Sequence, residues 1–213
     1  MSGGLPISPP AFYYRGRHCL LRELSEEDIR SLYPHAQVLA VLADYRPWYK
    51  PQVHPLEWMV QRRDWLASVD PPMELEALVL DAVHQSPLGF VSLAAIDTFN
   101  GKAELALGMF RGRGTRATLE TLHWVMETAF STLGLHKLVF CVSADNTPAH
   151  RLLAHLGIPL EAVLRSEMRT ETGDRTDLMR YALLAPEWQQ GPLRPQFQSW
   201  VPLRTPSGAP LPI

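Results

Sequence analysis

A short glycine- and arginine-rich run, RGRGTR at residues 111–116, has the composition of an anion site. Its two glycines let the backbone approach a ligand closely, and its three arginines supply cationic, fork-shaped donors. The run lies between an expected strand and the start of an expected helix. The first turn of a helix has unpaired N–H groups and the positive end of the helix dipole. The run therefore predicts a site for phosphate or pyrophosphate; the alternative is a solvated basic turn.

Two nucleotide-binding motifs can be compared with this run. Gly112, Gly114 and Ala117 match the dinucleotide fingerprint in form. That fingerprint needs parallel βαβ units and an acidic residue about 20 positions further on. The candidate acid, Asp145, lies farther along the chain than that, and the strands before the run are expected to be antiparallel. No Gly-Lys-Ser/Thr sequence of a P-loop is present. A nucleotide-binding oxidoreductase remains a less favoured alternative.

Hydrophobic periodicity and turn signals predict the elements that position the run. Strands are expected at 18–24, 75–82, 88–96, 103–110, 138–142, 161–171 and 175–184. Helices are expected at 26–42 with a break at Pro34, and at 55–68, 117–133 and 148–156. Ser25 is expected to cap the first helix, and Thr147 the last. The order predicts an α+β fold: a mixed, mostly antiparallel central sheet flanked by about four helices, with a strand–helix–strand crossover over 103–142.

Length and composition predict one globular domain with terminal extensions. The chain has 213 residues, of which 46% are hydrophobic and 20% charged. Its net charge of −2 favours neither nucleic acid nor a membrane surface as a partner. Ten of the 19 prolines lie in residues 1–10 and 186–213. We therefore expect an N-terminal arm at 1–11, the domain at 12–188 and a proline-rich extension at 189–213.

Cysteine and histidine usage points to a reduced protein without a metal. Cys19 and Cys141 are too few for a disulfide framework. None of the eight histidines falls in a metal-binding spacing. No signal-peptide pattern and no apolar run of about 20 residues is present, so a cytoplasmic location is expected.

Three motifs in order resemble signatures of the GNAT acetyltransferase superfamily, over about residues 17–188, and within it the RimJ/RimL-like branch. The first is the pyrophosphate loop, Arg/Gln-x-x-Gly-x-Gly/Ala, which Arg111 and Gly114 match, whereas Arg116 stands where a small residue is usual. The second, Asp-Asn-x-x-Ser…Leu-Gly-Phe, is matched by Asp145, Asn146 and Leu156-Gly157-Ile158. The third, Gly-x-x-x-Asp…Tyr-x-Leu…Glu-Trp, is matched by Gly173, Asp177, Tyr181, Leu183, Glu187 and Trp188.

The resemblance implies acetyl transfer from acetyl-CoA to a primary amine, directly within a ternary complex. The amine would belong to a protein N-terminus or to a small molecule. The GNAT fold places a splayed strand at the acetyl-CoA site, and Asn146 is expected beside the pantetheine arm. By this resemblance, the residues expected to bind acetyl-CoA are Leu107, Met109, Phe110, Arg111, Gly112, Arg113, Gly114, Thr115, Arg116 and Asn146.

The resemblance also suggests catalytic and acceptor-binding residues. Glu104 opens the splayed strand and is the expected base; the alternative is an exposed carboxylate at a strand end. Ala149 and Leu153 occupy the positions of the usual acids, so His150 is the candidate acid, against the alternative of a surface histidine. Trp48 and Tyr49 are expected at the acceptor site, against the alternative of packing between the first two helices.

Two further alternatives stay open. The absence of both usual acids also fits a non-catalytic domain that binds or senses acyl-CoA. The identity of the amine is open because the same fold accepts many amines, and a homodimer is a possible assembly.

Overall fold

The computed structural model describes residues 12–32, 35, 38, 41, 55–68, 74–170 and 173–203. The strands are β1 (Phe12–Arg15), β2 (Cys19–Arg22), β3 (Leu75–Asp81), β4 (Pro87–Asp97), β5 (Lys102–Met109), β6 (Lys137–Ser143), β7 (Leu160–Arg169) and β8 (Arg175–Leu184). The helices are α1 (Glu26–Leu32), α3 (Pro55–Ser68), α4 (Arg116–Glu127), α5 (Thr147–His155), α6 (Ala185–Gln190) and α7 (Leu193–Trp200). A π-helical turn, η1 (Thr128–Thr132), extends α4.

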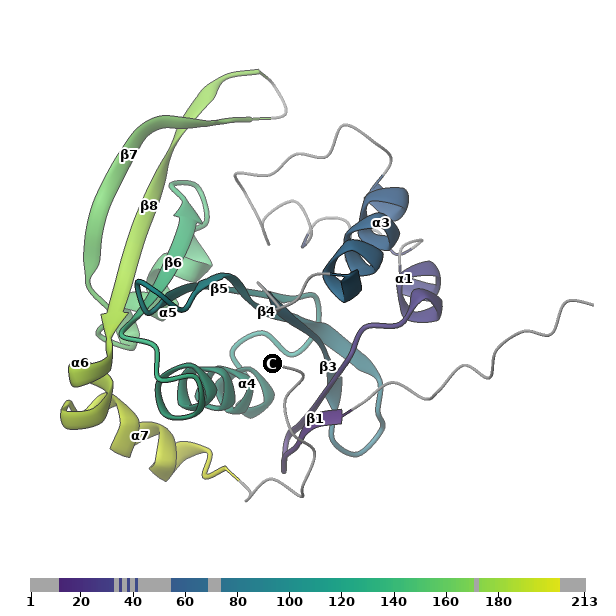
Figure 1. Cartoon of the computed structure of the whole chain (residues 1–213), viewed down its shortest axis with the longest axis horizontal. Coiled ribbons are helices and arrows are strands. Elements are labelled where there is room, and N and C mark those ends of the chain that lie inside the picture. Colours follow the sequence, from purple (N-terminus) through teal and green to yellow (C-terminus); the bar gives the residue numbers. More distant parts are fainter. Residues whose placement is uncertain are drawn as a thin grey trace, which may run out of the picture.

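The strands form one eight-stranded sheet in the order β1-β2-β3-β4-β5-β6-β8-β7 (Figure 1). Neighbouring strands are antiparallel except β5 and β6, which α4 connects in parallel. The mixed, mostly antiparallel sheet and the crossover through α4 are confirmed. The described part of the chain has six helices rather than about four, because α6 and α7 follow β8, where no helix was predicted.

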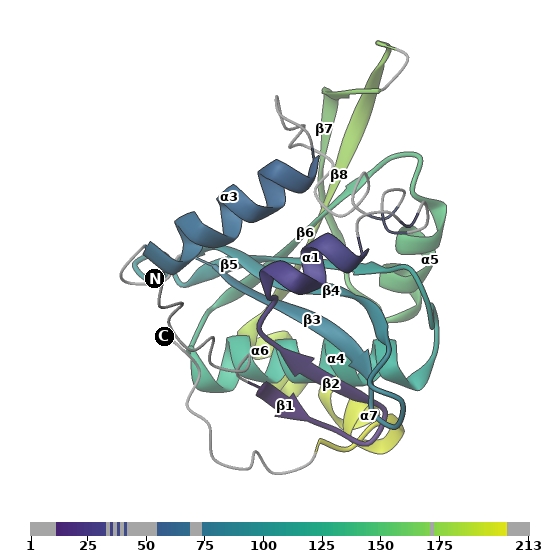
Figure 2. The same cartoon turned by 90° about the vertical axis from the view of Figure 1, so that its right-hand side faces the viewer.

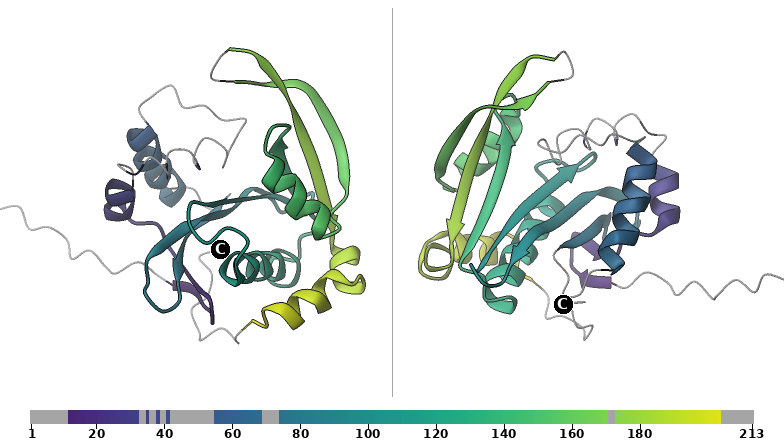
Figure 3. Two further views of the ribbon diagram at one scale, coloured as in Figure 1. Left: turned by 180° about the vertical axis from the view of Figure 1, so that it is seen from behind. Right: turned by 45° about the horizontal axis from the view of Figure 1, so that its top comes forward.

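The sheet opens between β5 and β6 (Figure 3). These strands pair at three positions, of which Glu104 opposite Val139 is the last. Beyond this point β5 still pairs with β4 as far as Met109, and β6 still pairs with β8 as far as Ser143. Each half of the sheet therefore keeps its own ladder while the two halves diverge.

Helices cover both faces of the sheet (Figure 2). On β5, Ala103, Leu105 and Met109 belong to the core that includes α4 and α7, whereas Ala106 belongs to the core beneath α1 and α3. Because side chains alternate along a strand, Glu104 shares the α1–α3 face with Ala106. Ser25 caps α1 as expected, since its hydroxyl accepts the Asp28 N–H at 3.1 Å.

A buried carboxylate on α4 holds the first hairpin. The sequence predicted one strand at 18–24, whereas the structure has the hairpin β1–β2. Glu120 is fully buried and accepts hydrogen bonds from the Tyr14 hydroxyl at 3.1 Å and from the backbone N–H groups of residues 17, 18 and 19 at 2.9, 2.6 and 3.0 Å. A Cβ on Gly16 would lie 2.6 Å from the Glu120 carboxyl carbon, so the turn needs glycine.

The C-terminal helices belong to the hydrophobic core. Trp188 on α6 and Phe197 on α7 are fully buried beside α4. His123 on α4 is 2% exposed, and its Nδ1 lies 2.8 Å from the Val201 carbonyl oxygen. Because a carbonyl only accepts, Nδ1 carries the hydrogen. This segment was expected to be a proline-rich tail; Pro186 is tolerated because it lies in the first turn of α6.

Replacing the buried carboxylate should destabilise the protein strongly. Glu120→Ala leaves several buried donors without their acceptor, at about 1–3 kcal/mol for each such group. We expect the free energy of unfolding in urea to fall by about 3 kcal/mol or more. Glu27→Ala, on the exposed side of α1, is the control and should change it little. A loss below about 1 kcal/mol for Glu120→Ala would show that the hairpin is held by other contacts.

The docking of α7 should weaken in mild acid. Burial lowers the pKa of His123, so the folded protein favours the neutral ring. Its contribution to stability is complete above the unfolded pKa of about 6.5 and is lost as the pH falls from there through the lowered folded pKa. We expect the free energy of unfolding to decrease as the pH falls below about 6.5, above the range in which Asp28 and Glu127 titrate.

Two variants separate this effect from other titrations. His123→Asn keeps a side-chain N–H donor but does not titrate, so the pH dependence in this range should become shallower. His84→Asn alters an exposed turn and should retain the wild-type slope. An unchanged slope in His123→Asn would refute the assignment.

Candidate functional site

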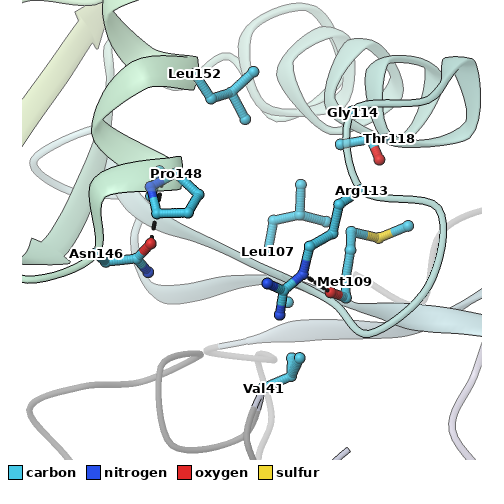
Figure 4. A pocket seen from close by; sticks show the side chains of 11 residues that line it. Val41, Leu107, Met109, Arg113, Gly114, Thr118, Asn146, Pro148 and Leu152 are labelled. Carbon is cyan, nitrogen blue, oxygen red and sulfur yellow. Dashed lines mark hydrogen bonds between the residues drawn. The ribbon is translucent and has the colours of Figure 1, made fainter. Parts of the chain in front are cut away.

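A cavity of about 380 Å³ lies where the sheet opens, between the end of β5 and the start of α5 (Figure 4). Side chains and backbone from β5, from the loop after it and from α5 line this space. They include Leu107, Met109, Arg113, Gly114, Asn146 and Leu152. The predicted anion run and the predicted pantetheine-binding asparagine therefore meet at one cavity, although they are far apart in sequence.

The loop of residues 110–115 folds back onto the start of α4. The Gly112 carbonyl accepts hydrogen bonds from the Thr115 N–H at 3.2 Å, the Thr115 hydroxyl at 2.6 Å and the Thr118 hydroxyl at 2.8 Å. Gly112 and Gly114 have φ of +66° and +70°, a conformation that favours glycine. Gly114 lines the cavity, so a small residue stands where the helix N-terminus meets the open space.

The three arginines of the loop take different positions. Arg113 lines the cavity, and its Nε donates to the Met109 carbonyl at 2.6 Å (Figure 4). This bond fixes the guanidinium at the cavity while its terminal nitrogens stay available. Arg116 lines a second cavity of about 200 Å³, together with Leu119, His155 and Trp200. Arg111 is exposed and lines neither space.

Some predicted acetyl-CoA residues support the loop without lining the first cavity. Phe110 packs edge-on against Phe90 at 5.7 Å, on the α1–α3 face. The N–H groups of Phe110 and Arg111 both donate to the Leu88 carbonyl at 3.0 Å. Thr115 caps α4 by its position but uses its hydroxyl on Gly112. These contacts tie the loop to β4.

Asn146 closes the other side of the cavity. The sequence predicted Thr147 as the cap of the short helix, but the structure places the cap one residue earlier. The Asn146 side chain accepts the Ala149 N–H at 3.2 Å and faces the cavity (Figure 4). Sequence reasoning missed Thr118 and Leu152 as lining residues. Helical spacing could have found them, since each lies four residues after another lining residue, Gly114 or Pro148.

The opening between β5 and β6 forms a fork whose base is the last pair of the two strands. Glu104 lies at this base, on the face opposite α4, and does not line the cavity. It is partly buried. Its neighbour on the same face is Cys141: burial first, and then the Glu104 charge, raise the pKa of that thiol to about 12. Glu104 is thus close to the point where β5 and β6 separate, but it lies on the side away from α5.

His150 is held by two hydrogen bonds. Its Nε2 lies 2.9 Å from the Ser143 carbonyl oxygen, and its Nδ1 lies 2.9 Å from the Tyr181 hydroxyl. Because the carbonyl only accepts, Nε2 donates to it, and Nδ1 shares the second hydrogen bond with the Tyr181 hydroxyl. His150 does not line the cavity, whereas the preceding Ala149 does. The contact with Tyr181 was not predicted.

Trp48 and Tyr49 lie outside the described residues. Within the described ranges, no three His, Cys, Asp or Glu side chains are grouped so as to hold a metal ion. None of the helices in those ranges is long and apolar enough to span a membrane.

Comparison with known proteins identifies the family. Residues 18–158 match the acetyltransferase (GNAT) domain, so the chain belongs to the GNAT acetyltransferases, a family of N-acetyltransferase enzymes. A GCN5-related N-acetyltransferase from Brucella melitensis superposes with a TM-score of 0.70 at 19% identity, covering 92% of this chain and 87% of that one. No curated protein matches the chain by sequence.

A second solved structure shows the same fold. Spermidine N-acetyltransferase from Vibrio cholerae, in complex with CoA and spermine, superposes with a TM-score of 0.67 at 20% identity, covering 81% of this chain and 98% of that one. At this identity the likeness establishes the GNAT fold and leaves the acceptor of the present enzyme open.

Proposed function

We propose that the protein transfers an acetyl group from acetyl-CoA to a primary amine, directly within a ternary complex. The amine belongs to a small molecule or a protein N-terminus. One observation carries the proposal: the cavity in the sheet opening ends at a glycine–arginine loop on the N-terminus of α4. The RimJ/RimL-like branch and a cytoplasmic location belong to the same proposal, with sequence motifs and composition as their support.

The cavity has the chemistry that acetyl-CoA needs. Leu107, Met109 and Leu152 give an apolar passage for the pantetheine arm, and Asn146 supplies an amide beside it. Arg113 and the N–H groups around Gly114 suit the pyrophosphate, because the helix dipole and the arginine both favour an anion there. Arg116 and Trp200 at the second cavity suit the nucleotide end.

The chemistry requires a neutral amine and a stabilised carbonyl oxygen. Glu104 accepts the proton that the acceptor ammonium must lose before it attacks the thioester carbonyl. The edge of β5 beyond Glu104 faces away from β4 and has no strand partner among the described residues. Its N–H groups can stabilise the negative charge that develops on the carbonyl oxygen. As the acid, His150 must carry hydrogen on both ring nitrogens: Nδ1 then donates to the Tyr181 hydroxyl, which passes its own proton toward the departing thiolate.

A second candidate function is binding of acyl-CoA without turnover. Leu153, which occupies the position of one usual acid, is apolar and only 5% exposed, so it cannot supply a proton. A dinucleotide-binding oxidoreductase is less well supported, because the described strands contain one parallel pair and no second βαβ unit.

Blocking the loop should abolish acetyl-CoA binding. The Gly114→Val side chain would project at the cavity, where backbone and phosphate must meet. Gly134→Val at the other end of α4 is a matched control: its φ is +63° against +70° for Gly114, and both sites have open space for a Cβ. By calorimetry, we expect affinity for CoA to fall at least 100-fold in Gly114→Val only.

This comparison separates strain from binding. Both variants carry a β-branched residue at positive φ, so both should lose stability. Equal affinity in Gly114→Val and wild type would place CoA elsewhere. Absence of CoA binding by the wild-type protein at millimolar concentration would refute the proposed function as a whole.

Removing the expected base should slow turnover without weakening CoA binding. A general base contributes about 10²- to 10⁴-fold to a rate, so Glu104→Gln should lower kcat at pH 7 by about 100-fold or more in a thiol-release assay. The control Glu167→Gln, on the exposed side of β7, should keep the wild-type kcat. Undiminished turnover in Glu104→Gln would remove this residue as the base. If the wild-type protein released no thiol with any amine of a broad panel, the binding domain would be favoured.

A further inference from the structure

Glu104 has a cationic neighbour across the open half of the sheet. Cys141 on β6 lies directly opposite Arg180 on β8, and directly opposite residues of an antiparallel pair share one face. Glu104 on β5 lies opposite Val139, two positions before Cys141 on the same face. Glu104, Cys141 and Arg180 therefore form a row across three strands on the face away from α4.

The charges of this row act on its central residue. The Glu104 carboxylate and the Arg180 guanidinium shift the pKa of the Cys141 thiol in opposite directions. Both charged groups are therefore close to the same short piece of β6. This piece follows directly after the last pair between β5 and β6, where the fork begins.

The Arg180 guanidinium has unused donor capacity. Its Nε is buried and donates no hydrogen bond within the described part of the chain, although it is ion-paired. The ion-paired carboxylate beside it is Glu161, whose Oε2 lies 3.5 Å from Nε and whose other oxygen binds Lys137. A buried N–H without a hydrogen bond is destabilising, and the side chain as a whole is still 36% exposed. A bound molecule does not reach the buried Nε, but its oxygen can approach the exposed part of this side chain.

The two faces of the fork divide the substrates. The cavity assigned to acetyl-CoA is lined by β5, α4, α5 and the loop between β5 and α4, together with Val41. An acceptor must then reach the thioester through the fork from the opposite face, which carries Glu104 and Arg180. At the last pair between β5 and β6, two strand spacings, roughly 10 Å, separate β5 from β8.

We propose that Arg180 binds an anionic group of the acceptor, so that the acceptor is a small amino carboxylate: a primary amine with a carboxylate within a few bonds of its nitrogen. This inference rests on the proposed acetyl transfer. Glu104 faces the amine, and the Arg180 guanidinium receives the carboxylate, which a guanidinium can bind with two parallel hydrogen bonds. A polycation such as spermidine would meet a guanidinium beside the base and be repelled.

The test compares acceptors that differ only in this group. Thiol release from acetyl-CoA is measured with the twenty amino acids, each paired with its α-carboxamide, and with β-alanine, γ-aminobutyrate, aminoethylphosphonate and spermidine. We expect the anionic acceptors to exceed their amides at least 10-fold in kcat/KM. Arg180→Gln should lower kcat/KM for the anionic acceptor by roughly 10- to 100-fold, as for loss of a charged hydrogen bond, and change the amide less than threefold. Arg180→Lys should restore part of the loss.

A control variant and several contrary results complete this test. Arg169→Gln removes an exposed arginine farther along the same hairpin and should leave both acceptors unchanged. Two results overturn the role of Arg180 while acetyl transfer stands. One is a preference for spermidine or for the amides. The other is an equal loss of kcat/KM for both members of a pair in Arg180→Gln. CoA binding with no acceptor turned over overturns it too, whereas absence of CoA binding refutes the proposed function itself.

Discussion

The end of pairing between β5 and β6 is the constraint on which the site depends. Two adjacent parallel strands would normally continue their ladder, because unpaired backbone groups are costly when buried. Here the ladder stops at Glu104 opposite Val139. The separation is stable because each strand has a second partner: β5 pairs with β4 to its end, and β6 pairs with β8 along its whole length. The open edge that results leaves backbone groups of β5 without a strand partner among the described residues, so they can face a ligand.

The remaining structure brings chemistry to this opening and keeps it rigid. The loop at Gly114 and the cap at Asn146 approach it from one face, and Glu104 and Arg180 lie on the other. Helix α4 joins these parts, since it begins at the loop and is fixed to the first hairpin by Glu120. A domain built in this way can hold one substrate on each side of a sheet and let them meet in the gap.

Local signals in the sequence predicted much of this arrangement. Helix α3 was expected at its observed bounds, because Pro55 opens it and Asp70-Pro71 follows it. The place of the glycine–arginine loop, between a strand and a helix, was also predicted, whereas its binding of an anion stays a prediction. The sequence could not show the hairpin contact of Glu120, the burial of α7 around His123 or the row ending at Arg180. Each of these depends on residues far apart in the chain, and strand register decides which side chains share a face. Proline suggested a tail after residue 188, but proline also suits the first turn of a helix.

A crystal structure of the protein with acetyl-CoA tests the central claim most directly. The account predicts that the pantetheine arm lies in the opening between β5 and β6, beside Leu107 and Asn146. It also predicts the pyrophosphate on the loop at Arg113 and Gly114, and the thioester facing the side of the sheet that carries Glu104. Acetyl-CoA bound outside this opening, or with its pyrophosphate away from the start of α4, would contradict the account.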